Sequence, residues 1–144
     1  MDNIIDADKT GNFSKLLDIN IFEMGHGKSK ASLTIQPYHL NIAGIVHGGV
    51  YASLLDTALG VAVLATLNTG EIANTIDLSI HFLKSVSHGT IISEGMVTKR
   101  GRKIAFATGN VYDENHTLLA DAIGIWYIFP SDNINPVKND VDKR

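Results

Sequence analysis

The stretch NIAGIVHGGVYASLLDTALGVAVLATL, residues 41–67, decides the fold of this chain. From residue 48 to residue 67 it has no proline, and after the Gly48-Gly49 pair at its start Gly60 is the only glycine. Alanine and leucine dominate, so a helix is favoured. Apolar side chains cover most of the helix circumference, which predicts burial on most of its sides. The sequence NTG at residues 68–70 then supplies a stop signal.

Alternating apolar and polar residues predict strands on both sides of this helix. Residues 16–36 give two short alternating runs around the turn-like sequence GHGKS, which predicts a hairpin. Residues 75–82, TIDLSIHF, alternate strictly, which places Ile76 and Leu78 on one face and Thr75 on the other. Further strands are predicted at residues 89–100, 103–113 and 117–129. One long helix against an antiparallel sheet is an α+β layer architecture, and the sheet must curl to cover more than one side of the helix.

The composition fits one globular domain. The chain has 144 residues, of which 44% are hydrophobic and 19% charged, which is enough apolar material for a core. We expect a single domain over residues 1–130, with its packed part at about residues 12–130. Residues 131–144 are polar and have little to bury, so they are expected to form a disordered tail.

Charge, cysteine content and missing motifs argue against several classes of protein function. The net charge of −3 argues against a general binder of nucleic acids or membrane surfaces. The absence of cysteine excludes thiol catalysis and disulfides, and no metal-ligand, nucleotide-binding or GxSxG motif is present, so we expect neither metal nor cofactor. The first residues contain no apolar segment typical of a secretory signal, and a charge near the centre of residues 41–67 opposes a membrane span. A cytoplasmic protein is expected.

Asp56 is the first candidate site residue. It is the only Asp, Glu, Lys or Arg between Lys30 and Glu71. Burying an unpaired carboxylate is costly, so such a residue either reaches solvent on the helix surface or serves as an acid, base or nucleophile in a pocket. The sequence leaves both interpretations open.

The sequence His47-Gly48-Gly49 at the expected start of the helix is the second candidate. Two glycines let a ligand approach the backbone closely, and the first turn of a helix has unpaired N–H groups at the positive end of the helix dipole. Such a terminus can hold an anion or an oxyanion. The alternative is a plain junction between a loop and a helix.

The distance between these two candidates indicates a dimer. Gly48 and Asp56 are eight residues apart, which corresponds to about 12 Å of axial rise on a helix, too far for both to touch one reacting carbonyl. Two helices packed antiparallel across a two-fold axis would bring the start of one beside the middle of the other, and would also cover a second helix face. A homodimer would therefore complete the site.

The motif N-x5-H-G-G-x6-D from residue 41 to residue 56, followed by the alternating strand DLSIHFL, resembles the hotdog-fold acyl-CoA thioesterases, in their phenylacetate-pathway and thioesterase-superfamily branch. The resemblance covers residues 31–129. It implies one long central helix wrapped by a curved antiparallel sheet, a homodimer that can pair into a tetramer, and hydrolysis of an acyl-CoA to the free acid and CoA.

The resemblance also implies roles for individual residues. Asp56 matches the catalytic carboxylate, which activates water as a general base or attacks the thioester itself. Gly48 matches the glycine whose backbone N–H polarises the thioester carbonyl, with Gly49 beside it at the substrate. Asn41 matches the side chain that holds the nucleophile or water, and His47 matches a histidine with a supporting or polarising role.

One position of the motif has two alignments. Thr75 matches a hydroxyl residue that faces the carboxylate from a strand. Asn74 is the competing alignment, because the preceding loop is one residue longer than in relatives.

A basic turn predicts the site for the phosphates of CoA. The sequence TKRGRK places four cations around one glycine in a chain that is acidic overall, and arginine suits phosphate geometry. Relatives bind the nucleotide end near such a loop, while a solvated turn is the alternative. The candidate residues are Arg100, Gly101, Arg102 and Lys103.

Several further expectations accompany this interpretation. The acyl group, either aromatic or a medium or long fatty chain, is expected to enter between the helices beside Val50, Ala52 and Leu55. We interpret His39 as a surface or strand-face residue and Trp126 as part of the sheet core or an interface. The alternatives are a hotdog dehydratase, a non-catalytic acyl-CoA binding or sensing module, and a dimeric scaffold.

Overall fold

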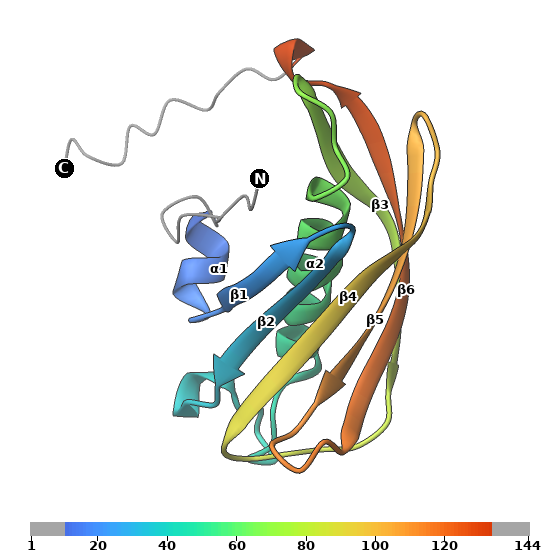
Figure 1. The fold of residues 1–144 in the computed structure, drawn as a ribbon. Coiled ribbons are helices and arrows are strands. Elements are labelled where there is room, and N and C mark those ends of the chain that lie inside the picture. The colour runs from blue at the N-terminus through green and yellow to red at the C-terminus, as the bar shows by residue number, and fades with distance from the viewer. Residues whose placement is uncertain (1–10, 134–144) are drawn as a thin grey trace, which may run out of the picture.

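The computed structural model describes residues 11–133 and shows a helix wrapped by an antiparallel sheet (Figure 1). The sheet has six strands in the order β1-β2-β4-β5-β6-β3, with antiparallel neighbours throughout. The α+β prediction is confirmed. The elements are α1 (Asn12–Leu16), β1 (Asn20–Gly25), β2 (Lys28–Thr34), η2 (Pro37–His39), α2 (Gly48–Leu64), β3 (Glu71–Phe82), β4 (Thr90–Arg100), β5 (Ile104–Tyr112), β6 (Leu118–Pro130) and η3 (Ser131–Asn133).

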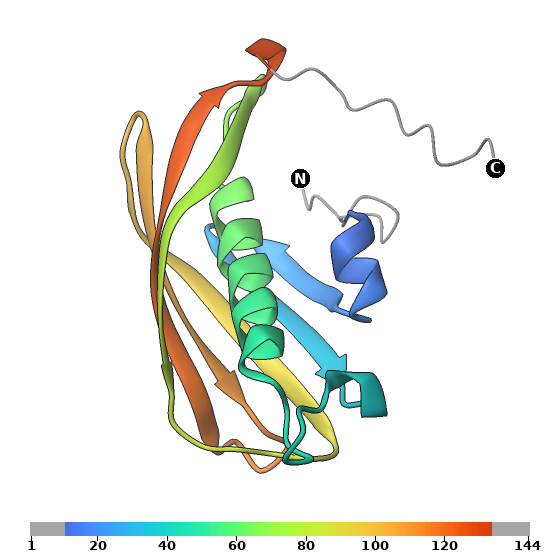
Figure 2. The ribbon, with the colours of Figure 1, turned by 180° about the vertical axis from the view of Figure 1, so that it is seen from behind.

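The helix α2 lies along the concave side of the sheet (Figure 2). Its residues Leu54, Leu55 and Leu59 are completely buried and belong to the hydrophobic core. A close approach to the sheet is possible because strand β4 has Gly95 at the contact, where an added Cβ would lie 2.8 Å from the carbonyl oxygen of Ala58. The predicted burial of the helix is confirmed on its sheet side. A stripe of small residues remains partly exposed along the helix: Ala52, Ser53, Asp56, Thr57 and Gly60.

The predicted hairpin before the helix is confirmed. His26 and Gly27, between β1 and β2, have φ angles of 50° and 70°, as a tight two-residue hairpin turn requires. The helix also begins where expected, but it ends at Leu64, three residues earlier than predicted. The Thr66 hydroxyl donates a 2.7 Å hydrogen bond to the carbonyl of Val63, which satisfies one carbonyl of the last turn.

The predicted strict alternation of strand β3 is wrong, because the strand contains a bulge. Thr75 pairs with Trp126 and Asp77 pairs with Ile125, so the register between β3 and β6 shifts at residue 76. As a result the Thr75 side chain faces the helix. Ile76, which was expected on the same face as Leu78, is 57% exposed. The bulge therefore decides which side chains of β3 reach the helix.

His39 is buried, which contradicts its interpretation as a surface or strand-face residue. Its Nδ1 accepts a hydrogen bond from the backbone N–H of Gln36, and its Nε2 lies 2.9 Å from the carbonyl oxygen of Leu17. These contacts tie the η2 turn to the end of α1. This histidine stabilises the loop that leads into α2.

Two predictions concern the ends of the chain and the membrane. The predicted tail lies outside the described residues from 134 onward, and its first three residues form the η3 turn. No helix within residues 11–133 has the length and apolar character needed to cross a membrane.

Candidate active site

Asp56 and Thr75 meet at the open side of the helix. The Thr75 hydroxyl donates a hydrogen bond of 2.7 Å to Oδ1 of Asp56, which joins the middle of α2 to the edge strand β3. Asp56 is partly exposed and lines a cavity of about 280 Å³. The carboxylate is thus both accessible to solvent and placed in a pocket. Asn74 also lines this cavity, but it is Thr75 that contacts the carboxylate.

The cavity extends from Asp56 toward the end of the helix. Its apolar walls include Ile21, Val61 and Leu64, and Trp126 of β6 forms another part of its lining. Trp126 belongs to the hydrophobic core, as predicted, and it also lines the pocket, which the prediction did not include. A tryptophan in an alternating strand resembles any other core aromatic, so the sequence contained no signal for this role.

Two of the three residues expected to shape the acyl entrance are core residues. Val50 is 6% exposed and Leu55 is completely buried, because both face the sheet. Only Ala52 lies on the partly exposed stripe of the helix. The prediction is wrong for Val50 and Leu55, since an all-round apolar helix does not reveal which of its faces is covered by the sheet.

The start of α2 has one free backbone donor. His47 is the N-cap residue, and its Nδ1 accepts a 2.8 Å hydrogen bond from the N–H of Gly49. The N–H of Val50 donates to the carbonyl of His47 at 2.9 Å. The N–H of Gly48 has no hydrogen-bond partner between residues 11 and 133. Of the two motif glycines, Gly48 therefore has the available N–H, while that of Gly49 is occupied by the cap.

Asn41 organises the loop that precedes the helix. Its Oδ1 accepts hydrogen bonds from the backbone N–H groups of Ala43 at 2.9 Å and Ile45 at 3.3 Å. This turn leaves the side-chain amide nitrogen of Asn41 as a donor. Within one chain, Asn41 and Gly48 belong to the start of the helix, whereas Asp56 and Thr75 lie two turns further along, about 12 Å away by axial rise.

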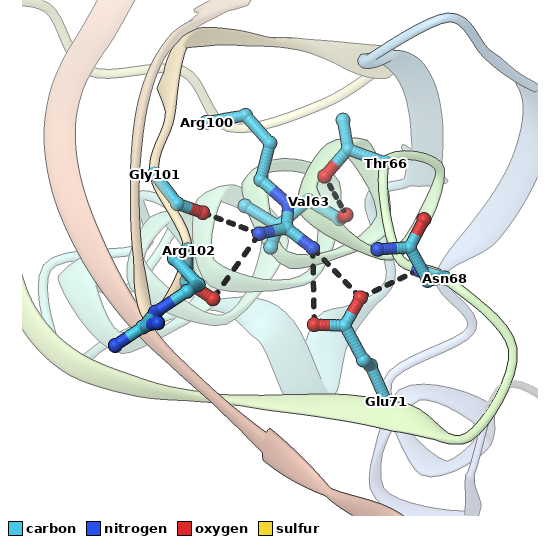
Figure 3. A network of polar contacts seen from close by, with 7 residues as sticks. All are labelled: Val63, Thr66, Asn68, Glu71, Arg100, Gly101 and Arg102. Atoms are coloured by element: carbon cyan, nitrogen blue, oxygen red, sulfur yellow. Dashed lines mark hydrogen bonds and ion pairs between the residues drawn. The ribbon is translucent and has the colours of Figure 1, made fainter.

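Arg100 in the basic turn is held by an ion pair (Figure 3). Its Nη2 contacts both carboxylate oxygens of Glu71 at 2.8 and 3.2 Å, and its Nη1 donates to the carbonyl oxygens of Gly101 and Arg102. A hydrogen bond from the backbone N–H of Asn68, and then the Arg100 charge, hold the pKa of Glu71 below its ordinary value.

The basic turn thus contains two kinds of cation. Arg100 is only 23% exposed and is already paired, so it holds the turn against the start of β3. Arg102 and Lys103 are exposed to solvent at the tip. Gly101 closes the turn through the hydrogen bond from its N–H to the carbonyl of Ile104 at 2.8 Å.

Among residues 11–133, no three His, Asp or Glu side chains gather in a group that could hold a metal ion.

Comparison with known proteins places this chain among esterases and thioesterases. A "putative esterase" of Archaeoglobus fulgidus is 32% identical over 120 residues, covering 83% of this chain and 76% of that protein. Acyl-coenzyme A thioesterase 13 of Homo sapiens is 28% identical over 102 residues, covering 69% of this chain and 72% of that protein.

Solved structures share the architecture. The conserved protein PA5202 of Pseudomonas aeruginosa superposes with a TM-score of 0.82 at 21% identity, covering 86% of this chain and 100% of that chain. The PaaI protein of the phenylacetic acid degradation operon of E. coli gives a TM-score of 0.75 at 24% identity, covering 81% and 83%. At these identities the likeness shows the fold, and the hotdog prediction is confirmed.

The family itself is identified from the sequence. The thioesterase superfamily matches residues 43–120, which include the start of α2, Asp56 and Thr75. Together with the 32% identity to the archaeal relative, this match shows that the chain belongs to the thioesterase superfamily.

Proposed function

We propose that this protein hydrolyses acyl-CoA thioesters to the free acid and CoA. The observation that supports the proposal best is the Asp56 carboxylate, held by the Thr75 hydroxyl at the edge of a cavity. The name of the human relative, an acyl-coenzyme A thioesterase, supports the same substrate class. The acyl group is either aromatic or a medium or long fatty chain.

Asp56 can act in two ways. As a general base it takes a proton from water while the water oxygen bonds to the thioester carbon, and the C–S bond then breaks with the proton passing to the leaving thiolate. As a nucleophile it bonds to that carbon itself and expels the thiolate, which leaves a mixed anhydride; water then hydrolyses the anhydride, restores the carboxylate and supplies the proton for the thiolate. In both routes negative charge develops on the carbonyl oxygen and needs a donor.

The donor that we propose is the Gly48 N–H of a second copy of the chain. Within one chain this N–H is free but lies about 12 Å along the helix from Asp56. The small-residue stripe of α2 leaves room for an antiparallel helix of a second copy, which would bring its Gly48 and Asn41 toward Asp56. Two sites per homodimer follow, and the dimer can pair again into a tetramer.

The nucleotide end of CoA is proposed to lie at the basic turn. Arg102 and Lys103 are exposed there and can meet phosphate oxygens. Arg100 is occupied by Glu71, so we assign it to positioning the turn together with Gly101.

Thiol release from a panel of acyl-CoA esters tests the proposed activity. Asp56→Asn keeps the size of the side chain and removes the base, so the rate should fall on the order of 10²–10⁴-fold. Asp121→Asn is the matched control, because Asp121 pairs with His81 away from the cavity. Equal rates for native protein and Asp56→Asn would contradict the role of Asp56. Binding of every ester without thiol release would favour a non-catalytic acyl-CoA module.

Mixing two inactive variants tests whether the site is shared between copies. Asn41→Asp keeps the oxygen that organises the loop and removes the amide donor, while Asp56→Asn removes the carboxylate. Random reassociation makes half of the dimers mixed, and each mixed dimer has one intact site, so about a quarter of the native activity should return. No recovery after verified exchange of subunits would show that each site is built by one chain.

A further inference from the structure

The Trp126 side chain has a defined orientation, set by a glycine on its own strand. Trp126 is 2% exposed and lies on the helix side of β6. A Cβ added at Gly124 would lie 2.5 Å from Cη2 and Cζ3 of the indole. Because glycine occupies that position, the six-membered ring can lie along the strand. The ring edge opposite Gly124 is then directed toward the helix.

The indole N–H faces an empty space beside Gly60. A Cβ added at Gly60 would lie 3.6 Å from Nε1 of Trp126, and this is the sole atom within 4 Å of that position outside the helix backbone and the adjacent residues. In the described part of the chain, no acceptor receives a hydrogen bond from this N–H. The nitrogen is not among the buried side-chain atoms that lack a partner, so it is open to the cavity, and the hydrogen bond that an indole N–H usually makes is available to a ligand. The site therefore offers a donor to whatever enters the cavity.

This donor lies next to the proposed catalytic carboxylate. Trp126 pairs with Thr75 across the β3–β6 ladder, and Thr75 donates to Asp56. Gly60 follows Asp56 by one helical turn, so their Cβ positions are about 5–6 Å apart on the same side of α2. The carboxylate and the indole N–H thus line one cavity, one helical turn from each other.

We infer that the Trp126 N–H binds an oxygen of the thioester substrate close to the reacting carbonyl. The inference rests on the proposed function and narrows its substrate class. The cavity has apolar walls at Val61, Leu64 and Ala73 and polar lining at Ser14, Thr57 and Asn74, so the indole N–H is one of a few polar groups that can orient a ligand there. A cavity of about 150 Å³ holds benzene, so the 280 Å³ here suit one short segment of a ligand.

Two parts of an acyl-CoA carry such an oxygen. One is an oxo or hydroxyl group on the acyl chain near the thioester, and the other is the first amide carbonyl of the pantetheine arm. Both are hydrogen-bond acceptors in the same chemical class, and the experiment separates them.

The fluorescence of Trp126 reports directly on this contact, because the chain contains one tryptophan. In the Asp56→Asn protein, which should consume the ester far more slowly than the native protein, titration with butyryl-CoA, 3-hydroxybutyryl-CoA and free CoA should change the emission. A response to 3-hydroxybutyryl-CoA alone assigns the oxygen to the acyl chain, and equal responses to all three assign it to the pantetheine arm. Binding of all three, measured by calorimetry, without any change in emission would overturn the inference.

Two variants test the same contact by kinetics. Gly60→Ala places a methyl group at ordinary contact distance in front of the N–H, and alanine suits a helix, so the protein should fold. Trp126→Phe keeps an aromatic ring and removes the donor. Each should raise KM for the responsive substrate roughly 5–10-fold, as expected for one lost hydrogen bond, with a smaller effect on kcat.

The matched control is Tyr127→Phe, which removes a polar atom from the next residue on the other face of β6 and should leave KM unchanged. Native KM values in both Gly60→Ala and Trp126→Phe would overturn the inference. So would a loss confined to Gly60→Ala and accompanied by a changed oligomeric state, because Gly60 would then serve helix packing. Failure of the proposed function differs from all of these outcomes, since no ester would then be hydrolysed by the native protein.

Discussion

Thr75 and Asp56, 19 positions apart in the sequence, share a hydrogen bond of 2.7 Å that ties the edge strand to the central helix. The hydroxyl donates to Oδ1, so within residues 11–133 the other carboxylate oxygen has no hydrogen bond from a protein donor. The bond thus orients the carboxylate and leaves one oxygen available to water or to a thioester.

Removing this hydroxyl should slow catalysis. Thr75→Val keeps the shape of the side chain but cannot donate, and a hydrogen bond to a charged group is worth about 1.5–3 kcal/mol, so kcat should fall roughly 10–100-fold. Thr75→Ser restores the donor and should recover most of the rate. Thiol-release kinetics of the two variants, with unfolding curves for each, measure the difference. An equal loss in both would indicate that the methyl group matters and the hydrogen bond does not.

Replacing Asn74 separates the two alignments of the motif. Asn74 lines the cavity but does not bond to Asp56. Asn74→Ala should therefore change kcat by no more than about twofold, as expected for a substitution that removes no critical contact. Steady-state kinetics beside Thr75→Val check this. A larger loss at Asn74 than at Thr75 would assign the motif position to Asn74.

The exposed cations of the basic turn should act on CoA and not on shorter thioesters. Arg102→Gln and Lys103→Gln should each raise KM for an acyl-CoA roughly 2–5-fold, as expected for an exposed ion pair, and the effect should shrink in high salt. KM for the matching acyl-pantetheine, which lacks the nucleotide, should stay unchanged. Equal effects on both substrates would dismiss the phosphate role.

Glu71, held by the Asn68 backbone N–H and then by Arg100, should give the fold an acid-sensitive component. The pKa of Glu71 is lowered from 4.5, so the unfolded chain takes up a proton at a higher pH than the folded chain does. The stabilising contribution of the Glu71 carboxylate is therefore fully present above about pH 4.5, and it is lost as the pH falls through the lowered pKa. Urea unfolding at pH 6 and pH 3 should show a smaller loss of stability for Glu71→Gln than for the native chain. Parallel losses would contradict a stabilising role of the Glu71 carboxylate.

Gly60→Ala should stabilise the protein while it impairs substrate binding. Glycine in a helix interior costs about 0.5–1 kcal/mol relative to alanine, and the added methyl has room beside Trp126. The free energy of unfolding in urea should rise by about that amount. A decrease would mean that the space at Gly60 is occupied in the assembled protein.

The regular elements were predictable because their periodicity lies within the local sequence. The helix start at Gly48 and the hairpin around His26 followed from glycine placement and alternation. The bulge at Ile76 could not be predicted, because it depends on how β3 pairs with β6, and strict alternation gave no sign of it.

The candidate site was predictable in its motif and not in its surroundings. Asp56 and Gly48 stood out because of charge and glycine content, and the structure places them as expected within one helix. The place of Trp126 depends on Gly124 and Gly60, which are 64 positions apart in the chain and approach the same indole only in the folded protein. The commitment of Arg100 to Glu71 is also a tertiary contact that charge counting cannot show.

The extra residue at position 76 has a consequence for comparing relatives. Strand residues before and after Ile76 pair with β6 in different registers. A sequence alignment without a gap at this point is therefore shifted by one residue on one side of Ile76, and it can place Asn74 where Thr75 belongs. In a strand without the extra residue, the position opposite Trp126 would be off by one in number yet the same in space. Homologous residues of this edge strand are therefore best matched by their partners on β6.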